Sequence, residues 1–466
     1  MKKIFLVDRQ AESRVVESVL TTTDWYIQVL IVLDDATKAR YLNHKRIGII
    51  YTATEFFLLD ETAYIDFSKY KEYESIFKIV DSGMYRIEAD YQFVRYNFYM
   101  GITVWEKLFD NYKPDLCILA GMIHGLTFDS LMLAVAKRKS ILGYVISAIN
   151  MHLLVTYKGW GECILQLEYK YRKKDVWNIV QKDAYYYKEL KIPEQKNHSI
   201  KAGIIKLIST LGGVSTLLVV RSLFHGKSHF TWYEGRKLKT SIFNYAAKTL
   251  QWKYITILND KKSVKADYDC KYVVYFLHFE PEAVISHYAN HMDSQIIIIK
   301  MIAKSLPKGW KLYVKEHPDT RKLNDNRTAY ALAYFMEFYK PYNSMWYWES
   351  IRNTPNLEFI NVKEDATKLI KNAKAISTMA GTVIMESILN NKPCLIFGDS
   401  QKIPYSSISG IYNISSTDEC RHALDEIENS KWQGYKNLEI VNTCLLIRDK
   451  NGYESAVQNI IEDVDK

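Results

Sequence analysis

The chain has 466 residues, a formal net charge of +9, and a composition that is 48% hydrophobic and 25% charged. This length exceeds one ordinary hydrophobic core, so we expect at least two domains, and the composition is typical of a soluble globular protein. The positive charge is spread along the chain without a nucleic-acid-binding motif, so no nucleic acid partner is expected. The cysteines form no CxxC pair, which argues against a disulfide framework or a cysteine metal site: they are Cys117, Cys163, Cys270, Cys394, Cys420 and Cys444.

The first part of the chain alternates short apolar runs with helical patterns. This alternation is typical of a parallel sheet joined by crossover helices, and it predicts an α/β domain over residues 1–155. Strands are expected at 4–7, 29–33, 47–51, 115–119 and 143–146, and helices within 70–109 and at 128–137. The first apolar run is too short for the apolar region of a signal peptide.

Residues 156–265 are less regular and rich in Tyr, Lys and Trp, so we predict a helical insertion or linker there. Within it, residues 207–220 carry no charge but are too few to span a bilayer. A buried helix is the favoured interpretation of this stretch, and a segment lying at a membrane surface is the alternative.

The second α/β domain is predicted over residues 266–430, followed by C-terminal helices over 431–466. Strands are expected at 272–277, 310–314, 357–360, 375–376 and 394–397, and helices at 294–306, 365–373 and 382–390. Ser294 is placed to cap the first of these helices. The last residues follow a helical spacing, with Tyr453, Val457 and Ile460 on the apolar face.

A first polar segment, Lys315-Glu316-His317-Pro318, directly follows a predicted strand. The ammonium of Lys315 and the imidazole of His317 are donors suited to the oxygens of a phosphate or diphosphate. They would also stabilise charge on a departing nucleotide, which gives His317 a catalytic role. The alternative is an ordinary charged surface turn.

A second segment, Ser377-Thr378-Met379-Ala380-Gly381-Thr382, joins a predicted strand to a helix. Backbone N–H groups at the start of a helix favour an anion, Gly381 permits close approach, and Ser377, Thr378 and Thr382 add hydroxyl groups. Glu386, about one turn later, could hold a ribose or sugar hydroxyl. The alternative is a capped helix with Glu386 in solvent.

A third segment, His278-Phe279-Glu280-Pro281-Glu282, follows a further strand of the same predicted sheet. It offers an imidazole at His278 and the carboxylates of Glu280 and Glu282, which suit sugar hydroxyls. The carboxyl ends of parallel strands lie at one edge of a sheet, where ligands bind in open α/β folds. We therefore expect the three segments to form one nucleotide pocket.

Residues 275–283, 314–318 and 377–398 resemble the bacterial capsule and surface-polysaccharide synthesis proteins, a family that includes retaining Kdo transferases using CMP-activated sugar. The resemblance implies an α/β fold of the GT-B class, with two Rossmann-like domains facing a cleft and the nucleotide held mainly by the second. It implies a nucleotide-sugar substrate, CMP-linked with CMP-Kdo as the leading donor, and no further cofactor. The acceptor would be lipid-linked or a growing polysaccharide, which places the enzyme in the cytoplasm near the inner membrane surface.

The His-Pro pair is also similar to bacterial sialyltransferases and to the polyglycerol-phosphate transferases of teichoic acid synthesis. A transferase of glycerol or ribitol phosphate from a CDP-linked donor is therefore an alternative. A second alternative is a non-catalytic scaffold that binds a nucleotide or a glycan.

Candidate catalytic groups in the first domain lie in the loop after residue 119. His124 could accept a proton from the acceptor, and Asp129 could act as a nucleophile or orient a base. Alternatively, His124 is a simple loop residue and Asp129 a helix cap. No Asp-x-Asp motif stands at a strand end, so we predict catalysis without a metal ion.

Overall fold

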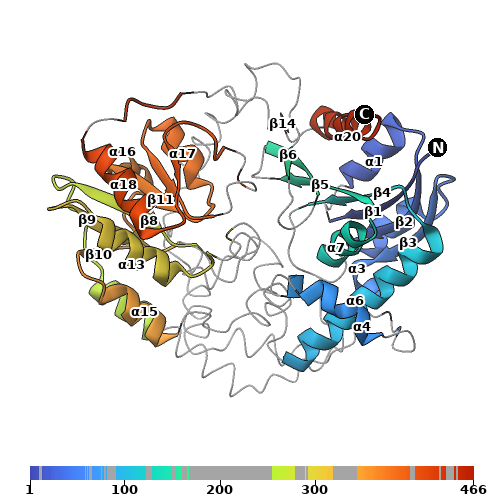
Figure 1. The fold of residues 1–466 in the computed structure, drawn as a ribbon, viewed down its shortest axis with the longest axis horizontal. Helices are drawn as coiled ribbons and strands as arrows, with labels where there is room; N and C mark the ends of the chain where they lie inside the picture. Colours follow the sequence, from blue (N-terminus) through green and yellow to red (C-terminus); the bar gives the residue numbers. More distant parts are fainter. Residues whose placement is uncertain are drawn as a thin grey trace, which may run out of the picture.

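The computed structural model of the chain describes two α/β halves that lie side by side in Figure 1. The described residues are 1–9, 13–57, 66–74, 91–121, 129–148, 153–159, 165–166, 254–278, 292–317, 344–398, 405–429, 432–436, 446–447 and 450–466, with a few single positions between them.

The N-terminal half is built on a parallel sheet whose strands are buried apolar runs. Its parallel strands are β1 (Lys3–Asp8), β2 (Tyr26–Val32), β3 (Ile47–Thr52), β4 (Leu116–Ala120) and β5 (Leu142–Ala148), in the order β5-β4-β1-β2-β3. Both faces of β1, β2, β4 and β5 are largely buried, as expected where helices cover a parallel sheet on both sides, and the edge strand β3 is partly exposed. The five predicted strands are therefore confirmed.

Helices cover the two faces of this sheet separately. The helices of this half are α1 (Arg14–Thr22), α2 (Asp35–Tyr41), α3 (Ala53–Phe57), α4 (Phe67–Tyr70), the 3₁₀ helix η2 (Lys71–Tyr73), α6 (Tyr91–Tyr112) and α7 (Ser130–Arg138). Phe5 and Val7 of β1 share a core with Trp105 of α6, whereas Ile4 and Leu6 share another core with α1.

Antiparallel strands extend this sheet beyond β5. β6 (Leu153–Lys158) pairs with β5, and both β7 (Leu165–Gln166) and β14 (Leu446–Ile447) pair with β6. The domain boundary predicted at residue 155 thus falls inside a strand. Most of the insertion predicted over 156–265, including 207–220, lies outside the described residues. A helix over 254–262 belongs to the second half, because Ile255 joins its core and Val264 bridges Ile360.

The C-terminal half contains a second, fully parallel sheet. Its strands are β8 (Tyr272–Phe276), β9 (Lys311–Lys315), β10 (Leu357–Ile360), β11 (Ala375–Thr378), β12 (Cys394–Ile396) and β13 (Ile411–Asn413), in the order β10-β9-β8-β11-β12-β13. The chain winds outward from β8 in one direction and then resumes at β11 in the other. The topological switch point, where open α/β sheets bind ligands, therefore lies between β8 and β11.

The helices of the C-terminal half also divide between the faces of their sheet. They are α13 (Gln295–Ser305), α15 (Met345–Arg352), α16 (Ala366–Asn372), α17 (Val383–Leu389) and α18 (Thr417–Glu428). α13, α15 and α18 share one core, and α16 and α17 lie on the other face. The hydroxyl of Ser294 accepts the N–H of Ile297, so the predicted cap of α13 is confirmed. β13, α15 and α18 were not predicted.

The last helix, α20 (Lys450–Val464), returns to the N-terminal half and lies beside α1 (Figure 1). Tyr453, Val457 and Ile460 are fully buried in the core that α1 shares with β1. The carboxylate of Asp463 accepts the Tyr144 hydroxyl at 2.7 Å and pairs with Lys158 at 2.7 Å. The end of the segment predicted as separate C-terminal helices is therefore structurally part of the first half.

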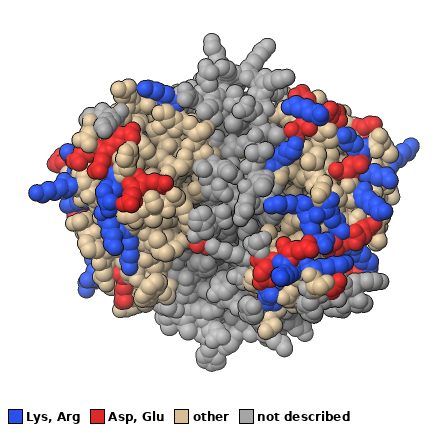
Figure 2. Space-filling view, in the orientation of Figure 1, with Lys and Arg blue, Asp and Glu red and all other residues tan. Residues whose placement is uncertain are grey.

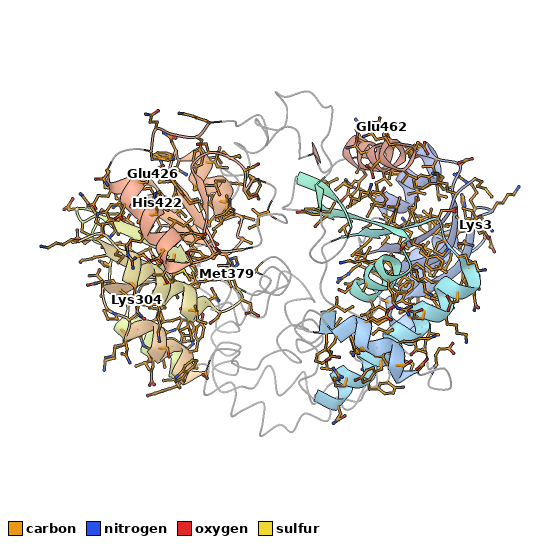
Figure 3. All side chains as sticks on the ribbon, viewed as in Figure 1. Lys3, Lys304, Met379, His422, Glu426 and Glu462 are labelled. Atoms are coloured by element: carbon orange, nitrogen blue, oxygen red, sulfur yellow. The ribbon has the colours of Figure 1, made fainter. Side chains whose placement is uncertain are left out.

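The two sheets present their carboxyl edges toward the region between the halves. Figure 3 places Lys3, at the start of β1, on the outer side of the N-terminal half, and Met379, just after β11, on the inner side of the C-terminal half. Two doubly wound sheets in series, with a terminal helix returned to the first, are the GT-B architecture predicted from the sequence. No described helix is both long and apolar enough to span a membrane.

The packing of α20 predicts a specific loss of stability. Ile460→Ala should lower the free energy of unfolding by about 2–4 kcal/mol, because it removes buried methyl groups and leaves a cavity against α1. Urea unfolding monitored by circular dichroism would measure the loss. Gln458→Ala, on the exposed face of the same helix, is the matched control and should change stability by less than about 0.5 kcal/mol. Equal effects of the two variants would contradict the docking of α20.

Candidate nucleotide site at the switch point of the second sheet

A histidine and a threonine meet across the switch point of the C-terminal sheet. His278 lies two residues beyond β8, and Thr378 is the last residue of β11. The Nε2 atom of His278 lies 3.0 Å from the Oγ1 atom of Thr378, and both side chains are buried. Two of the three predicted segments are therefore brought into direct contact.

The turn after Thr378 is closed by the same hydroxyl group. The backbone N–H of Gly381 donates to Oγ1 of Thr378 at 3.3 Å. A Cβ atom on Gly381 would lie 3.0 Å from that oxygen and 3.1 Å from Cε1 of His278. Glycine therefore lets the turn approach the imidazole closely, and a larger residue would crowd both groups.

The other hydroxyl groups of this segment have different surroundings. Ser377 is fully buried, and its Oγ donates to the carbonyl of Val274 at 3.1 Å, which ties β11 to β8. The exposed Thr382 precedes α17 without a side-chain capping bond. Among the site residues that the structure describes, Thr378 is the one of the three hydroxyl-bearing residues whose side chain is seen to contact another predicted site residue.

The Lys315–His317 segment lies at the neighbouring strand end. Lys315 pairs in register with Phe276 of β8, and its ammonium donates to the carbonyl of Val362 at 2.6 Å. Lys315 and Glu316 are each 4% exposed, whereas His317 is half-buried. His317 is thus the most accessible of the three at this edge.

Glu386 is a desolvated carboxyl group at the start of α17. It lies in the first turn of α17, and burial raises the pKa of its carboxyl group from 4.5 to about 7. The described part of the chain offers this group no hydrogen bond, which distinguishes it from a carboxylate in a solvated salt bridge. A desolvated carboxylate without a partner is an acceptor for a ligand hydroxyl. Glu280 and Glu282, the other predicted carboxylates, lie outside the described residues.

The predicted catalytic residues of the N-terminal half have one described member. Asp129 is fully buried and caps α7, accepting both the N–H and the hydroxyl of Ser130. Its second oxygen accepts from the guanidinium of Arg9 at 2.5 Å. This arrangement corresponds to the helix-cap alternative, because a buried, ion-paired carboxylate is poorly placed to act as a nucleophile. His124 lies outside the described residues.

One buried residue of the site was missed in the sequence. Gln295, the first residue of α13, contacts both backbone polar groups of His278. The only signal was a polar residue at the head of the apolar run Ile296–Ile299. Within the described part of the chain, no group of three or more His, Cys, Asp or Glu side chains is arranged to hold a metal ion.

Comparisons with known proteins give only distant similarities. No protein-family model and no curated protein matches the chain. Similar solved structures include a UDP-GlcNAc 2-epimerase from Methanocaldococcus jannaschii in complex with UDP-GlcNAc and UDP, with 13% identity, 99% coverage of both chains and a TM-score of 0.31. The S. aureus MnaA–UDP co-structure has 13% identity, coverage of 100% of this chain and 96% of that one, and a TM-score of 0.27. The calicheamicin glycosyltransferase CalG4 has 10% identity, coverage of 100% and 95%, and a TM-score of 0.23. Similarities at this level provide no argument about activity.

The close approach of Gly381 to His278 predicts a coupled effect of mutation. Gly381→Ala should cost about 1–3 kcal/mol of unfolding free energy, because the added methyl group crowds the imidazole and the Thr378 hydroxyl. The same change in a His278→Ala background should cost less, and chemical denaturation of the four proteins gives the coupling energy. Strictly additive losses would show that the two residues are not in contact.

The raised pKa of Glu386 predicts a pH-dependent effect on stability. Wild-type protein should lose stability as the pH rises from about 4.5 to about 7, because the unfolded chain releases this proton first. Glu386→Gln removes that loss, so the variant should be as stable as wild type near pH 4.5 and up to about 3 kcal/mol more stable at pH 8. Glu462→Gln, at an exposed position on α20, is the control. A constant difference between Glu386→Gln and wild type across this range would refute the shift.

Proposed function

We propose that this protein transfers a sugar from a nucleotide donor to a surface-glycan acceptor, with CMP-Kdo as the leading donor. The observation that supports the proposal most directly is the contact of His278 with Thr378 at the switch point of the second sheet. Polar groups from separate strand ends meet there, at the edge where open α/β sheets bind nucleotides. CMP-Kdo itself is supported only by the resemblance of the three segments to capsule synthesis proteins.

The phosphate and one hydroxyl group of the donor each have a proposed partner at this edge. The phosphate would lie at the Thr378–Gly381 turn, within reach of the His278 imidazole, with His317 and Lys315 on the neighbouring strand end. Glu386 would accept a hydroxyl of the ribose or the sugar, since its desolvated carboxylate has no hydrogen bond of its own among the described residues.

The proposed reaction breaks the bond between the anomeric carbon and the phosphate oxygen. Charge accumulates on the departing phosphate, and nearby N–H and O–H donors stabilise it most when they are already oriented. His317, Lys315 and the Thr378 turn supply such donors, so we propose catalysis that needs no metal ion. The acceptor hydroxyl then bonds to the anomeric carbon and gives up its proton, for which His124 stays the predicted base.

The proposed setting is the cytoplasmic face of the inner membrane, with a lipid-linked or polysaccharide acceptor. Acidic and basic side chains are interleaved over the described surface of both halves in the view of Figure 2. The described residues on that face form no continuous basic stripe of the kind that follows a nucleic acid backbone. The proposed partners are therefore a nucleotide sugar and a glycan, without a nucleic acid.

A panel of nucleotides tests the binding part of the proposal. CMP at about one hundred times its dissociation constant should stabilise the protein by about 2.7 kcal/mol, and cytidine, which lacks the phosphate, should act much more weakly. Comparison with UMP and UDP would show whether the site distinguishes cytosine from uracil. Thermal unfolding followed by fluorescence measures each shift. If none of the nucleotides raises the unfolding temperature, the site is wrongly assigned.

Transfer assays with CMP-, CDP- and UDP-linked donors test the reaction. His317→Ala should lower kcat/KM by about 10²- to 10³-fold, because it removes a donor to the departing phosphate. Activity should survive EDTA in the wild type. Exposed His422→Ala, on α18 and labelled in Figure 3, is the matched control and should keep full activity. Product formation from a CDP-polyol alone would favour the polyol-phosphate alternative, and binding without turnover would favour a scaffold.

A further inference from the structure

Gln295 is a buried amide placed between α13 and the end of β8. It is 1% exposed and stands at the first helical position, directly after the Ser294 cap. Ile296, Ile298 and Ile299, which follow it, fill the core between α13 and the sheet. A polar amide at this buried position therefore has a role other than apolar packing.

The amide of Gln295 binds both backbone polar groups of one residue, His278. Its Oε1 atom accepts the backbone N–H of His278 at 2.8 Å, and its Nε2 atom donates to the carbonyl of His278 at 3.4 Å. The hydroxyl of Tyr275 donates to Oε1 at 3.4 Å, and the hydroxyl of Tyr347 accepts from Nε2 at 3.3 Å. The N–H of His278 can only donate and its carbonyl can only accept, so these two backbone groups fix the orientation of the amide, and the two tyrosine hydroxyl groups complete its hydrogen bonding.

The position of His278 explains why such a contact is needed. The ladder between β8 and β9 ends at Phe276, and that between β8 and β11 ends at Tyr275. The buried backbone groups of His278 thus lie beyond the strand pairing, and buried N–H and C=O groups require partners. The amide of Gln295 supplies both, in place of a neighbouring strand.

We propose that Gln295 is a positioning residue that holds the His278 imidazole at the switch point. Fixing the N–H and carbonyl of residue 278 fixes the direction in which its side chain leaves the backbone. The imidazole is then held at 3.0 Å from Thr378, where the proposed function places the phosphate of the donor. The inference rests on that proposed function for its catalytic consequence, but the geometry it asserts is independent of it.

Imidazole NMR of ligand-free protein tests the geometry. Gln295→Leu should move the ¹⁵N resonances of His278, identified by their loss in His278→Gln, because the imidazole leaves Thr378. Gln295→Glu keeps an acceptor for the N–H of His278 and should leave those resonances closer to wild type. Ile297→Gln is the matched control, since Ile297 is 62% exposed on the same helical turn. Unchanged His278 resonances in Gln295→Leu would overturn the proposal.

Kinetics with the donor found in the panel test the consequence. Gln295→Leu should lower kcat by about 10- to 100-fold while KM changes by less than about threefold, because a displaced group near the reacting phosphate mainly affects the transition state. Gln295→Glu should recover much of kcat. A lowered kcat in Gln295→Leu with no recovery in Gln295→Glu would indicate general structural damage and overturn the positioning role.

Two further outcomes separate this inference from the proposed function. If wild-type protein neither transfers nor binds any nucleotide, the proposed function fails, while the NMR comparison still decides whether Gln295 holds His278. If Gln295→Leu prevents folding, Gln295→Asn replaces it, because its shorter side chain cannot reach both backbone groups. Wild-type resonances and kcat in Gln295→Asn would overturn the proposal in the same way.

Discussion

The hydrogen bond between His278 and Thr378 is the contact on which the candidate site depends. It joins the ends of β8 and β11, the two strands between which the winding of the second sheet reverses. Because β8 and β11 are paired neighbours, the sheet brings their ends together, although the helices that follow them pack on opposite faces. One polar contact across the switch point gives the edge a defined shape, and Gly381 allows it by having no side chain.

Burial makes that shape rigid. Lys315, Ser377 and Gln295 are polar residues with almost no exposed surface, and each has a hydrogen bond to a backbone group. Breaking one of these bonds would leave a buried donor or acceptor unpaired, which is costly where water cannot enter. Of the described residues proposed to meet the donor, His317 and Glu386 are half-buried, whereas Lys315, His278 and Thr378 are buried and already held in place by the fold.

Local structure could be predicted well from the sequence, because an apolar run of strand length indicates a buried strand. Each predicted strand of both parallel sheets is present, and so is the cap at Ser294. Contacts between distant residues were not predictable, since the chain carries no signal that Arg9 pairs with Asp129 or that α20 packs on α1. Gln295 was missed for the same reason. Its partner is the backbone of His278, and a contact with a backbone group leaves no signal in the identity of the partner residue.

A difference between the two sheets supports placing the proposed nucleotide site at the second one. At the switch point of the first sheet, between β1 and β4, the charged side chains already have partners within the protein. The carboxylate of Asp8 accepts the N–H of Val16 at the start of α1, and Arg9 is bound to Asp129. An anionic phosphate there would have to displace a carboxylate from a helix N-terminus and compete for a buried guanidinium. The second switch point has His278 and Thr378 in the corresponding places, and an imidazole with a hydroxyl group repels no phosphate.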